Sequence, residues 1–309
     1  ELDSLGYDRR VLSPPIPMLR RTTLLFALLL LPLTAGILSE PCAAQKKGTH
    51  KRTIETGGMT RDFLLHIPSG YNPRQKKLVP MVIMLHGRNG SSEMASSAYY
   101  GWKALAKKEK FIVVFPSGIG KPVQWHQGTG AAATKDSLFL SDTIDLMLKE
   151  LKVDPNKVYM TGHSSGAFMA YSFAATHSHK IAAIGPVAGL LIDKTKPKFP
   201  VSVISFHGMV DEIVPYGKEG SWGIPTATES AALFAKHGDC SEHKREDLNK
   251  GLVHLDTWTM KKGNTEVQLY SLEKGGHGWP QPGSKSVKTT QLIWEFFKAH
   301  PREPAKKKS

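Results

Sequence analysis

Short runs of consecutive apolar residues recur along the chain, separated by stretches long enough to form helices. Within these runs polar residues do not alternate cleanly with apolar ones, a pattern that predicts strands buried on both faces of a parallel sheet. The predicted buried strands comprise residues 81–85, 111–115, 158–161, 182–187, 201–206 and 267–272. Residues 61–68 alternate between polar and apolar side chains and therefore predict a strand at the edge of the sheet.

The stretches between several predicted strands have the spacing of amphipathic helices. The apolar positions on one side of the helix predicted at residues 138–151 are Leu140, Ile144, Met147, Leu148 and Leu151. Residues 231–237 and 292–300 show a similar spacing. Strands that alternate with helices imply right-handed crossovers, so the pattern predicts a doubly wound, three-layer α/β domain with a mostly parallel sheet and helices on both faces.

The first 44 residues differ in pattern from the rest. Arg20 and Arg21 precede a leucine-rich run at residues 24–33, and small residues follow near position 44. This order is typical of a secretory signal peptide, so residues 18–44 are predicted to direct export to the periplasm or the extracellular medium. Residues 1–17 are predicted not to belong to the mature protein. The apolar run is too short for a spanning helix, so no stable membrane anchor is expected.

After residue 44 the chain contains no internal repeat and no proline- or glycine-rich linker. Residues 45–303 are therefore predicted to form a single domain, followed by a basic tail at residues 304–309. The chain has 41 lysines and arginines against 27 aspartates and glutamates, a net charge of +14. Because the basic residues form no helical stripe and are not interleaved with aromatic residues, nucleic acid is not expected as a partner, whereas an anionic polysaccharide stays compatible. No sequence feature sets an oligomeric state.

Two cysteines, Cys42 and Cys240, allow at most one disulfide, and removal of the predicted signal peptide would leave Cys240 alone. Cys240 is therefore predicted to be a small buried apolar residue. His237, Cys240 and His243 have the spacing of metal ligands, but no compact set of four ligands accompanies them, as structural zinc requires. Neither a metal ion nor another cofactor is expected.

The most informative motif is Gly162-x-Ser164-x-Gly166, which lies between a predicted strand and a predicted helix. This strand–turn–helix setting is typical of a nucleophile elbow. The sharp turn forces the serine into a strained backbone conformation, in which side chains two residues away would collide. We therefore predict that Ser164 is a nucleophile, and that the Ser165 amide at the start of the helix donates a hydrogen bond to a developing oxyanion.

A serine hydroxyl needs a base to take its proton, and the base needs an acid to orient it. Asp211 follows the strand predicted at residues 201–206, and His277 follows the next predicted strand between flanking glycines. In α/β-hydrolases the acid and the base come after the nucleophile in this order, so these two residues are predicted to complete a catalytic triad. The alternatives assigned to packing or to the surface are His163, His207 and Glu212.

A second oxyanion donor is expected on the loop after an earlier strand. The first buried strand leads into His86-Gly87-Arg88, where the glycine allows the backbone to approach a ligand closely. The candidate donor is the amide of Gly87 or Arg88, and Arg88 is preferred, whereas His86 is interpreted as a hydrogen-bonded structural residue. Trp125 and Trp279 are candidates for substrate binding. The alternative, that these large aromatic residues belong to the hydrophobic core, fits the sequence equally well.

Together these segments resemble the secreted polyhydroxybutyrate (PHB) depolymerase-like esterases, which are related to feruloyl and acetylxylan esterases. The resemblance extends from about residue 61 to residue 279 and rests chiefly on Leu85-His86-Gly87, residues 154–159, residues 207–216 and residues 275–280. It implies a three-layer α/β-hydrolase fold, the nucleophile Ser164, the acid Asp211 and the base His277. The sequence departs from the family pattern at Arg88, where cysteine is frequent, and at Ser165, where asparagine is usual.

The sequence therefore predicts a secreted serine esterase that hydrolyses carboxylic esters, of small molecules or of polymers, through an acyl-enzyme. A feruloyl or acetylxylan esterase acting on plant polysaccharide is the alternative substrate class, and a peptidase of the same fold would share the triad. An alternative of another class is a non-catalytic, basic glycan-binding protein on a hydrolase scaffold. The complete set of triad candidates in the expected order favours the enzyme.

Overall fold

The computed structural model describes residues 46–303 except 129, 193, 218–222 and 283–285. The segments predicted at residues 1–17, 18–44 and 304–309 lie outside the described residues. None of the helices in the described part is both long and apolar enough to cross a bilayer.

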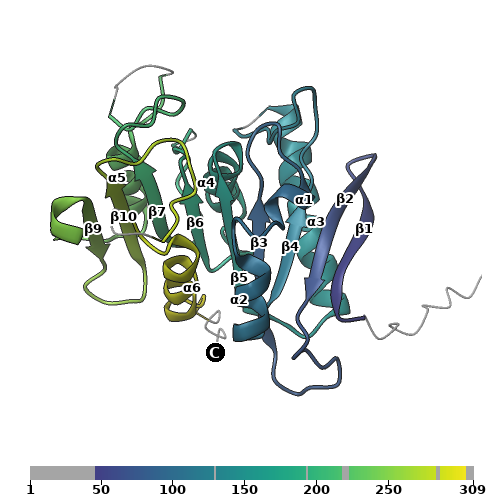
Figure 1. The fold of residues 1–309 in the computed structure, drawn as a ribbon. Coiled ribbons are helices and arrows are strands. Elements are labelled where there is room, and N and C mark those ends of the chain that lie inside the picture. The colour runs from purple at the N-terminus through teal and green to yellow at the C-terminus, as the bar shows by residue number, and fades with distance from the viewer. Residues whose placement is uncertain (1–45, 129, 193, 218–222, 283–285, 304–309) are drawn as a thin grey trace, which may run out of the picture. The chain divides into compact units, whose positions relative to one another are not determined.

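Ten strands of the described chain form one sheet, in the order β1-β2-β4-β3-β5-β6-β7-β10-β9-β8 (Figure 1). Neighbouring strands are parallel from β4 to β10 and antiparallel at both ends of the sheet. The strands are β1 (Gly48–Thr56), β2 (Met59–Ile67), β3 (Val79–Leu85), β4 (Ile112–Pro116), β5 (Val153–His163), β6 (Ala183–Val187), β7 (Ser202–Gly208), β8 (Glu242–Leu248), β9 (Val253–Thr259) and β10 (Glu266–Leu272).

Helices cover both faces of this sheet, and Figure 1 shows α2 and α6 in front of it. The helices are α1 (Ser92–Ala95), α2 (Trp102–Glu109), α3 (Ala131–Glu150), α4 (Ser165–His177), α5 (Ala227–His237) and α6 (Thr289–Ala299). On β3, Met81 and Ile83 belong to the core that includes α3, α4 and α5, whereas Val82 and Met84 belong to the core that includes α2 and α6. The predicted three-layer α/β fold is confirmed.

The differences from the prediction lie mainly at the two ends of the sheet. The strand predicted at residues 61–68 is β2, but it is not the edge, because β1 pairs with it over its whole length. β1 and β8 consist mainly of polar and charged residues, so they lack the apolar run that predicts a strand. Such charged outer strands disfavour pairing with another chain. α3 begins at Ala131 rather than at residue 138, because its first turn is rich in alanine, the best helix former.

The parallel strands bring the predicted site together. β3, β5, β7 and β10 run in the same direction, so their carboxyl ends meet at one rim of the sheet. The loops after these four strands carry Arg88, Ser164, Asp211 and His277 respectively. Ligands of open α/β sheets bind at this rim.

Candidate active site

The turn between β5 and α4 holds Ser164 in a strained conformation, with φ 53° and ψ −119°. A side chain at Gly162 would overlap the backbone of Gly166, and a Cβ at Gly166 would lie 2.5 Å from the carbonyl oxygen of Leu85. Both glycines are therefore required by the close approach of β3, β5 and α4. The turn raises the Ser164 hydroxyl at the first residue before the helix, which is the geometry of a nucleophile elbow.

Three loops bring Ser164, His277 and Asp211 into one hydrogen-bonded chain. The Ser164 hydroxyl lies 2.8 Å from His277 Nε2, and His277 Nδ1 lies 2.8 Å from Asp211 Oδ2. Because an aspartate oxygen accepts, Nδ1–H of His277 donates to it, and Nε2 is left to accept the Ser164 proton. The structure therefore places the three residues in the order that proton transfer from serine requires.

The environment of Asp211 favours its charged form. Its side chain is inaccessible to solvent, and Oδ1 accepts the backbone N–H groups of Ile213 and Val214 at 2.9 and 2.8 Å. Burial by itself raises the pKa of a carboxyl group, but the hydrogen bonds from His277 and Val214 outweigh it, so the pKa of Asp211 lies below its ordinary value. A charged Asp211 holds the imidazole in one tautomer.

Backbone contacts hold the loops of Asp211 and His277 against each other. The Val210 amide donates to the carbonyl of Gly275 at 3.1 Å, and the Met209 amide donates to the carbonyl of Leu272 at 2.8 Å. A side chain at Gly208 would overlap the backbone of Gly275. The glycine on each side of this contact therefore lets the two loops approach closely enough for the acid to reach the base.

The rejected alternatives occupy supporting positions. His207 is buried, donates from Nε2 to the carbonyl of Val214 at 2.8 Å, and has a pKa lowered by burial. The ring of His163 lies 5.3 Å from that of His277, and its Nδ1 lies 3.3 Å from the Tyr100 hydroxyl. Burial lowers the pKa of His163 to about 4. Neither His163 nor His207 hydrogen-bonds to Ser164, whose hydroxyl is engaged by His277.

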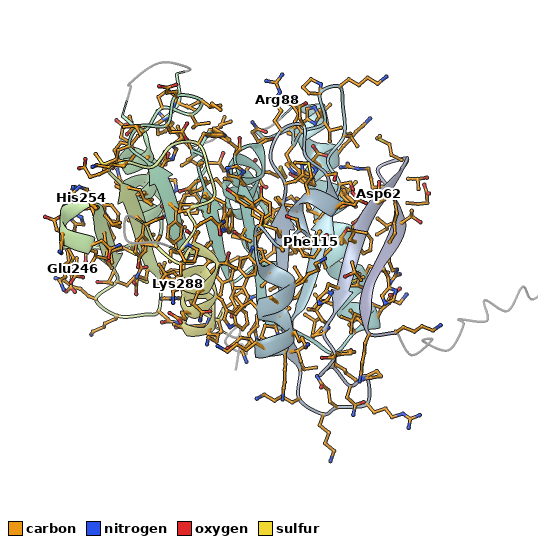
Figure 2. The ribbon with its side chains drawn as sticks, in the orientation of Figure 1. Asp62, Arg88, Phe115, Glu246, His254 and Lys288 are labelled. Atoms are coloured by element: carbon orange, nitrogen blue, oxygen red, sulfur yellow. The ribbon has the colours of Figure 1, made fainter. Side chains whose placement is uncertain are left out.

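The predicted oxyanion donors lie on two segments next to Ser164. A Cβ at Gly87 would lie 3.5 Å from the Cβ of Ser164, so the loop after β3 passes directly beside this serine. Within the described residues, the amides of Arg88 and Ser165 donate no hydrogen bond to protein. The Arg88 side chain is exposed and lies at the upper rim in Figure 2.

The two tryptophans predicted to bind substrate are buried instead. Trp125 and Trp279 are 1% and 2% exposed. The Trp125 indole donates to the carbonyl of His86 at 3.0 Å, and the Trp279 indole donates to the Thr290 hydroxyl at 3.0 Å. The indole N–H of each ring is hydrogen-bonded inside the protein, and almost none of the ring surface is exposed to a ligand. The structure therefore does not place either ring in a substrate pocket.

The spacing of His237, Cys240 and His243 does not produce a metal site in the structure. No group of three or more histidine, cysteine, aspartate or glutamate residues is suitably placed to hold a metal ion anywhere in the described ranges. Cys240 is a buried free thiol, and burial raises its pKa to about 11. His243 instead contacts Asp256 on β9 at 2.9 Å.

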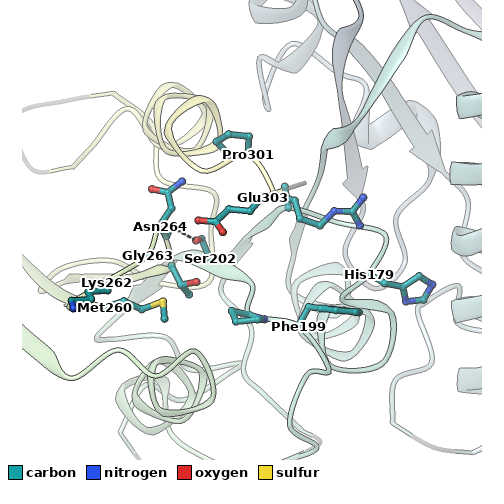
Figure 3. A pocket seen from close by; sticks show the side chains of 13 residues that line it. His179, Phe199, Ser202, Met260, Lys262, Gly263, Asn264, Pro301 and Glu303 are labelled. Carbon is teal, nitrogen blue, oxygen red and sulfur yellow. Dashed lines mark hydrogen bonds between the residues drawn. The ribbon is translucent and has the colours of Figure 1, made fainter. Parts of the chain in front are cut away.

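A cavity of about 550 Å³ is shown in Figure 3, and its lining includes none of Ser164, Asp211 and His277. It is lined by residues that precede β6, β7 and β10, together with the segment after α6, including Phe199, Met260, Lys262 and Arg302. This is the rim opposite to the one that carries Ser164. The Ser202 hydroxyl at its edge is already used, since it donates to Asn264 and accepts from the Glu266 amide.

The chain is similar to known esterases. The family described as esterase PHB depolymerase matches residues 62–210, a range that includes Ser164 but ends before Asp211 and His277. A bifunctional acetylxylan esterase/xylanase, XynS20E of Neocallimastix patriciarum, is 32% identical over 77% of this chain and 33% of its own length. A poly(3-hydroxyalkanoate) depolymerase C of Paucimonas lemoignei is 28% identical over 56% of this chain and 40% of its own length.

Longer coverage is found with a putative esterase, NocK of Nocardia uniformis subsp. tsuyamanensis, which is 26% identical over 75% of this chain and 74% of its own length. The chain thus spans a third to three quarters of these relatives. Among solved structures, an acetyl xylan esterase from Aspergillus awamori superimposes with a TM-score of 0.58 over 81% of this chain and 99% of its own, at 16% identity. These comparisons confirm the predicted resemblance and the fold.

Proposed function

As a relative of the PHB depolymerase family of esterases, the chain is, we propose, a serine hydrolase of carboxylic esters. The observation that carries the proposal is the hydrogen-bonded chain from Ser164 through His277 to Asp211. The strained elbow and the two unengaged amides beside the hydroxyl support it. Each of these features serves acyl transfer.

In the proposed mechanism, His277 Nε2 takes the proton of Ser164 as Oγ attacks the ester carbonyl carbon. The carbonyl oxygen becomes an oxyanion, which accepts hydrogen bonds from the Ser165 and Arg88 amides; one such donor contributes about 10²–10³-fold to kcat. His277 then gives its proton to the leaving alcohol. Water, activated by the same imidazole, attacks the acyl-enzyme and releases the acid and free Ser164.

The relatives described above suggest hydroxyalkanoate polymers and acetylated xylan. Feruloyl esters are a third class, because a probable feruloyl esterase C of Aspergillus niger is also similar, at 23% identity over 77% of this chain. Acetylated xylan is favoured among the plant esters, because the relative that is 32% identical to this chain is a bifunctional acetylxylan esterase/xylanase. Initial rates on p-nitrophenyl acetate, methyl ferulate, acetylated xylan and hydroxybutyrate oligomers would rank these classes. If the protein hydrolyses none of these four substrates, the proposed esterase function is rejected.

The direct test is the substitution Ser164→Ala. The variant is expected to keep the parental melting temperature and to lose both hydrolysis of p-nitrophenyl acetate and labelling by a fluorophosphonate probe. Ser241→Ala, which alters an exposed serine outside the site, is the matched control and should behave as the parent does. Parental turnover by Ser164→Ala would exclude the proposed nucleophile. A parent that is not labelled but is retained on an anionic polysaccharide column would favour the glycan-binding alternative.

Export is part of the same proposal and rests on the pattern of residues 18–44. Expression with this segment should place the mature chain outside the cytoplasm, with an N-terminus near Gln45. N-terminal sequencing of the exported protein measures the cleavage site. Accumulation of the uncleaved chain in the cytoplasm would contradict the proposed signal peptide.

A further inference from the structure

One loop contacts both segments that carry the proposed oxyanion donors. This loop comprises residues 117–128, between β4 and α3, and is called here the Trp125 loop. Its contacts with the segment after β3 are the hydrogen bonds from the Gly118 amide to His86 Nε2 at 2.8 Å and from the Asn89 amide to the carbonyl of Val123 at 2.7 Å. The segment that carries Arg88 is therefore held on both sides of that residue.

Trp125 connects this segment to the start of α4. Its indole N–H donates to the carbonyl of His86 at 3.0 Å, and its ring packs against the His86 imidazole at 5.2 Å. Its backbone N–H donates to the Ser165 hydroxyl at 3.0 Å, and that hydroxyl lies 3.4 Å from the Trp125 carbonyl. Trp125 therefore contacts His86, which lies two residues before Arg88, and also Ser165, whose own amide is the second predicted donor.

The Trp125 loop is itself anchored by a buried ion pair. Asp136 of α3 has a fully buried side chain, which receives Arg61 Nη1 at 2.8 Å and both the amide and Nδ1 of His126 at 2.8 and 3.0 Å. Arg61 also donates to the carbonyl of Ser117 at 3.0 Å. A buried charge that is satisfied in this way fixes its partners, because breaking any contact would leave a charge uncompensated.

We propose that Trp125 is a positioning residue that fixes the distance between the Arg88 and Ser165 amides; this rests on the esterase function proposed above. An oxyanion hole stabilises the transition state only when its donors lie 2.7–3.1 Å from the oxyanion. Trp125 hydrogen-bonds to both segments, through its indole to the carbonyl of His86 after β3 and through its backbone amide to the hydroxyl of Ser165, the first residue of α4. Its indole therefore acts on catalysis through the backbone and not by touching substrate.

The test is Trp125→Phe, which keeps a buried aromatic ring but removes the hydrogen bond to His86. We expect kcat for p-nitrophenyl acetate to fall by about ten- to a hundred-fold, as displacement of a reacting group by about 1 Å does, while KM changes by less than about two-fold. The dependence of kcat/KM on pH should keep the parental shape, because His277 and Asp211 are untouched. Ser165→Ala, which keeps the amide but removes the hydroxyl, should lower kcat in the same way.

The two substitutions should not be additive, since both loosen one connection. Trp294→Phe is the matched control: its buried indole also loses one hydrogen bond, to Glu109, but it lies on α6 on the other face of the sheet. This control should have parental kcat and KM. If Trp125→Phe does not fold, Ser165→Ala decides alone.

Parental kcat in a folded Trp125→Phe or Ser165→Ala variant would overturn the proposal. A raised KM with parental kcat would overturn it too, because Trp125 would then contact substrate. Fluorophosphonate labelling of the parent separates this failure from that of the esterase itself. A parent that is neither labelled nor active rejects the proposed function. A labelled, active parent together with a Trp125→Phe variant of parental kcat rejects the positioning role alone.

Discussion

Replacing Asp211 by asparagine changes which nitrogen of His277 carries the proton. Asp211 Oδ1 accepts two backbone amides, and Oδ2 accepts His277 Nδ1–H. In Asp211→Asn the amide oxygen must stay at the Oδ1 position, because an NH2 group there would face two N–H donors. The new NH2 group then faces Nδ1 of His277 and can only donate to it.

The consequence is a histidine in the wrong tautomer. With Nδ1 accepting, the proton of the neutral imidazole moves to Nε2, which then has no lone pair for the Ser164 hydroxyl. The geometry stays intact and general-base catalysis is lost, an effect of about 10⁴-fold in kcat. That loss corresponds to about 5.4 kcal/mol of barrier, at about 1.36 kcal/mol for each factor of ten.

Steady-state hydrolysis of p-nitrophenyl acetate at about pH 7.5, with active-site titration to correct for folded protein, measures this effect. Glu212→Gln is the matched control, since it removes the same charge from the adjacent, exposed side chain and should keep parental kcat. A kcat for Asp211→Asn within about tenfold of the parent, at an unchanged melting temperature, would refute the assigned hydrogen-bond directions.

Two further predictions concern stability. Gly166→Ala should lower the free energy of unfolding in urea by about 1–3 kcal/mol, because its Cβ would lie 2.5 Å from a backbone oxygen of β3. Gly217→Ala is the control and should leave this free energy unchanged, because a Cβ at Gly217 would meet no atom within 4 Å. Equal effects of the two substitutions would contradict the packing argument. His254 bonds Asp247 at 2.6 Å and Glu273 at 2.7 Å, and these bonds raise its pKa. The protonated form therefore stabilises the fold fully below about pH 6.5, and this contribution is lost as pH rises through the raised folded-state pKa. The gap in urea midpoint between the parent and His254→Asn should shrink with rising pH, and a constant gap would disprove the linkage.

Several features of the site were predictable because they depend on local geometry. The elbow at Ser164 needs a glycine two residues away on either side, and the sequence has glycine at both positions, Gly162 and Gly166. Asp211 and His277 each follow a predicted buried strand, so parallel pairing alone brings their loops to the rim of Ser164. Strand periodicity, together with the chain order of serine, aspartate and histidine in α/β-hydrolases, therefore predicted that Ser164 and His277 meet although they are 113 positions apart.

The features that the sequence did not reveal depend on contacts between distant segments. β1 and β8 carry no apolar run and are strands only because β2 and β9 offer them a hydrogen-bonding edge. Trp125 was indistinguishable from a pocket residue, since its composition reveals neither its burial nor the carbonyl that its indole binds.

The sequence by itself determined the fold class, the elbow and the order of the three side chains, because each follows from residues that are neighbours on the chain. The tertiary structure decided the hydrogen-bonding distances, the edges of the sheet and the place of Trp125 between His86 and Ser165. Backbone groups of segments far apart in sequence make those contacts, and every residue except proline presents the same amide. Their pairing is therefore fixed by packing and leaves no residue-specific pattern to read.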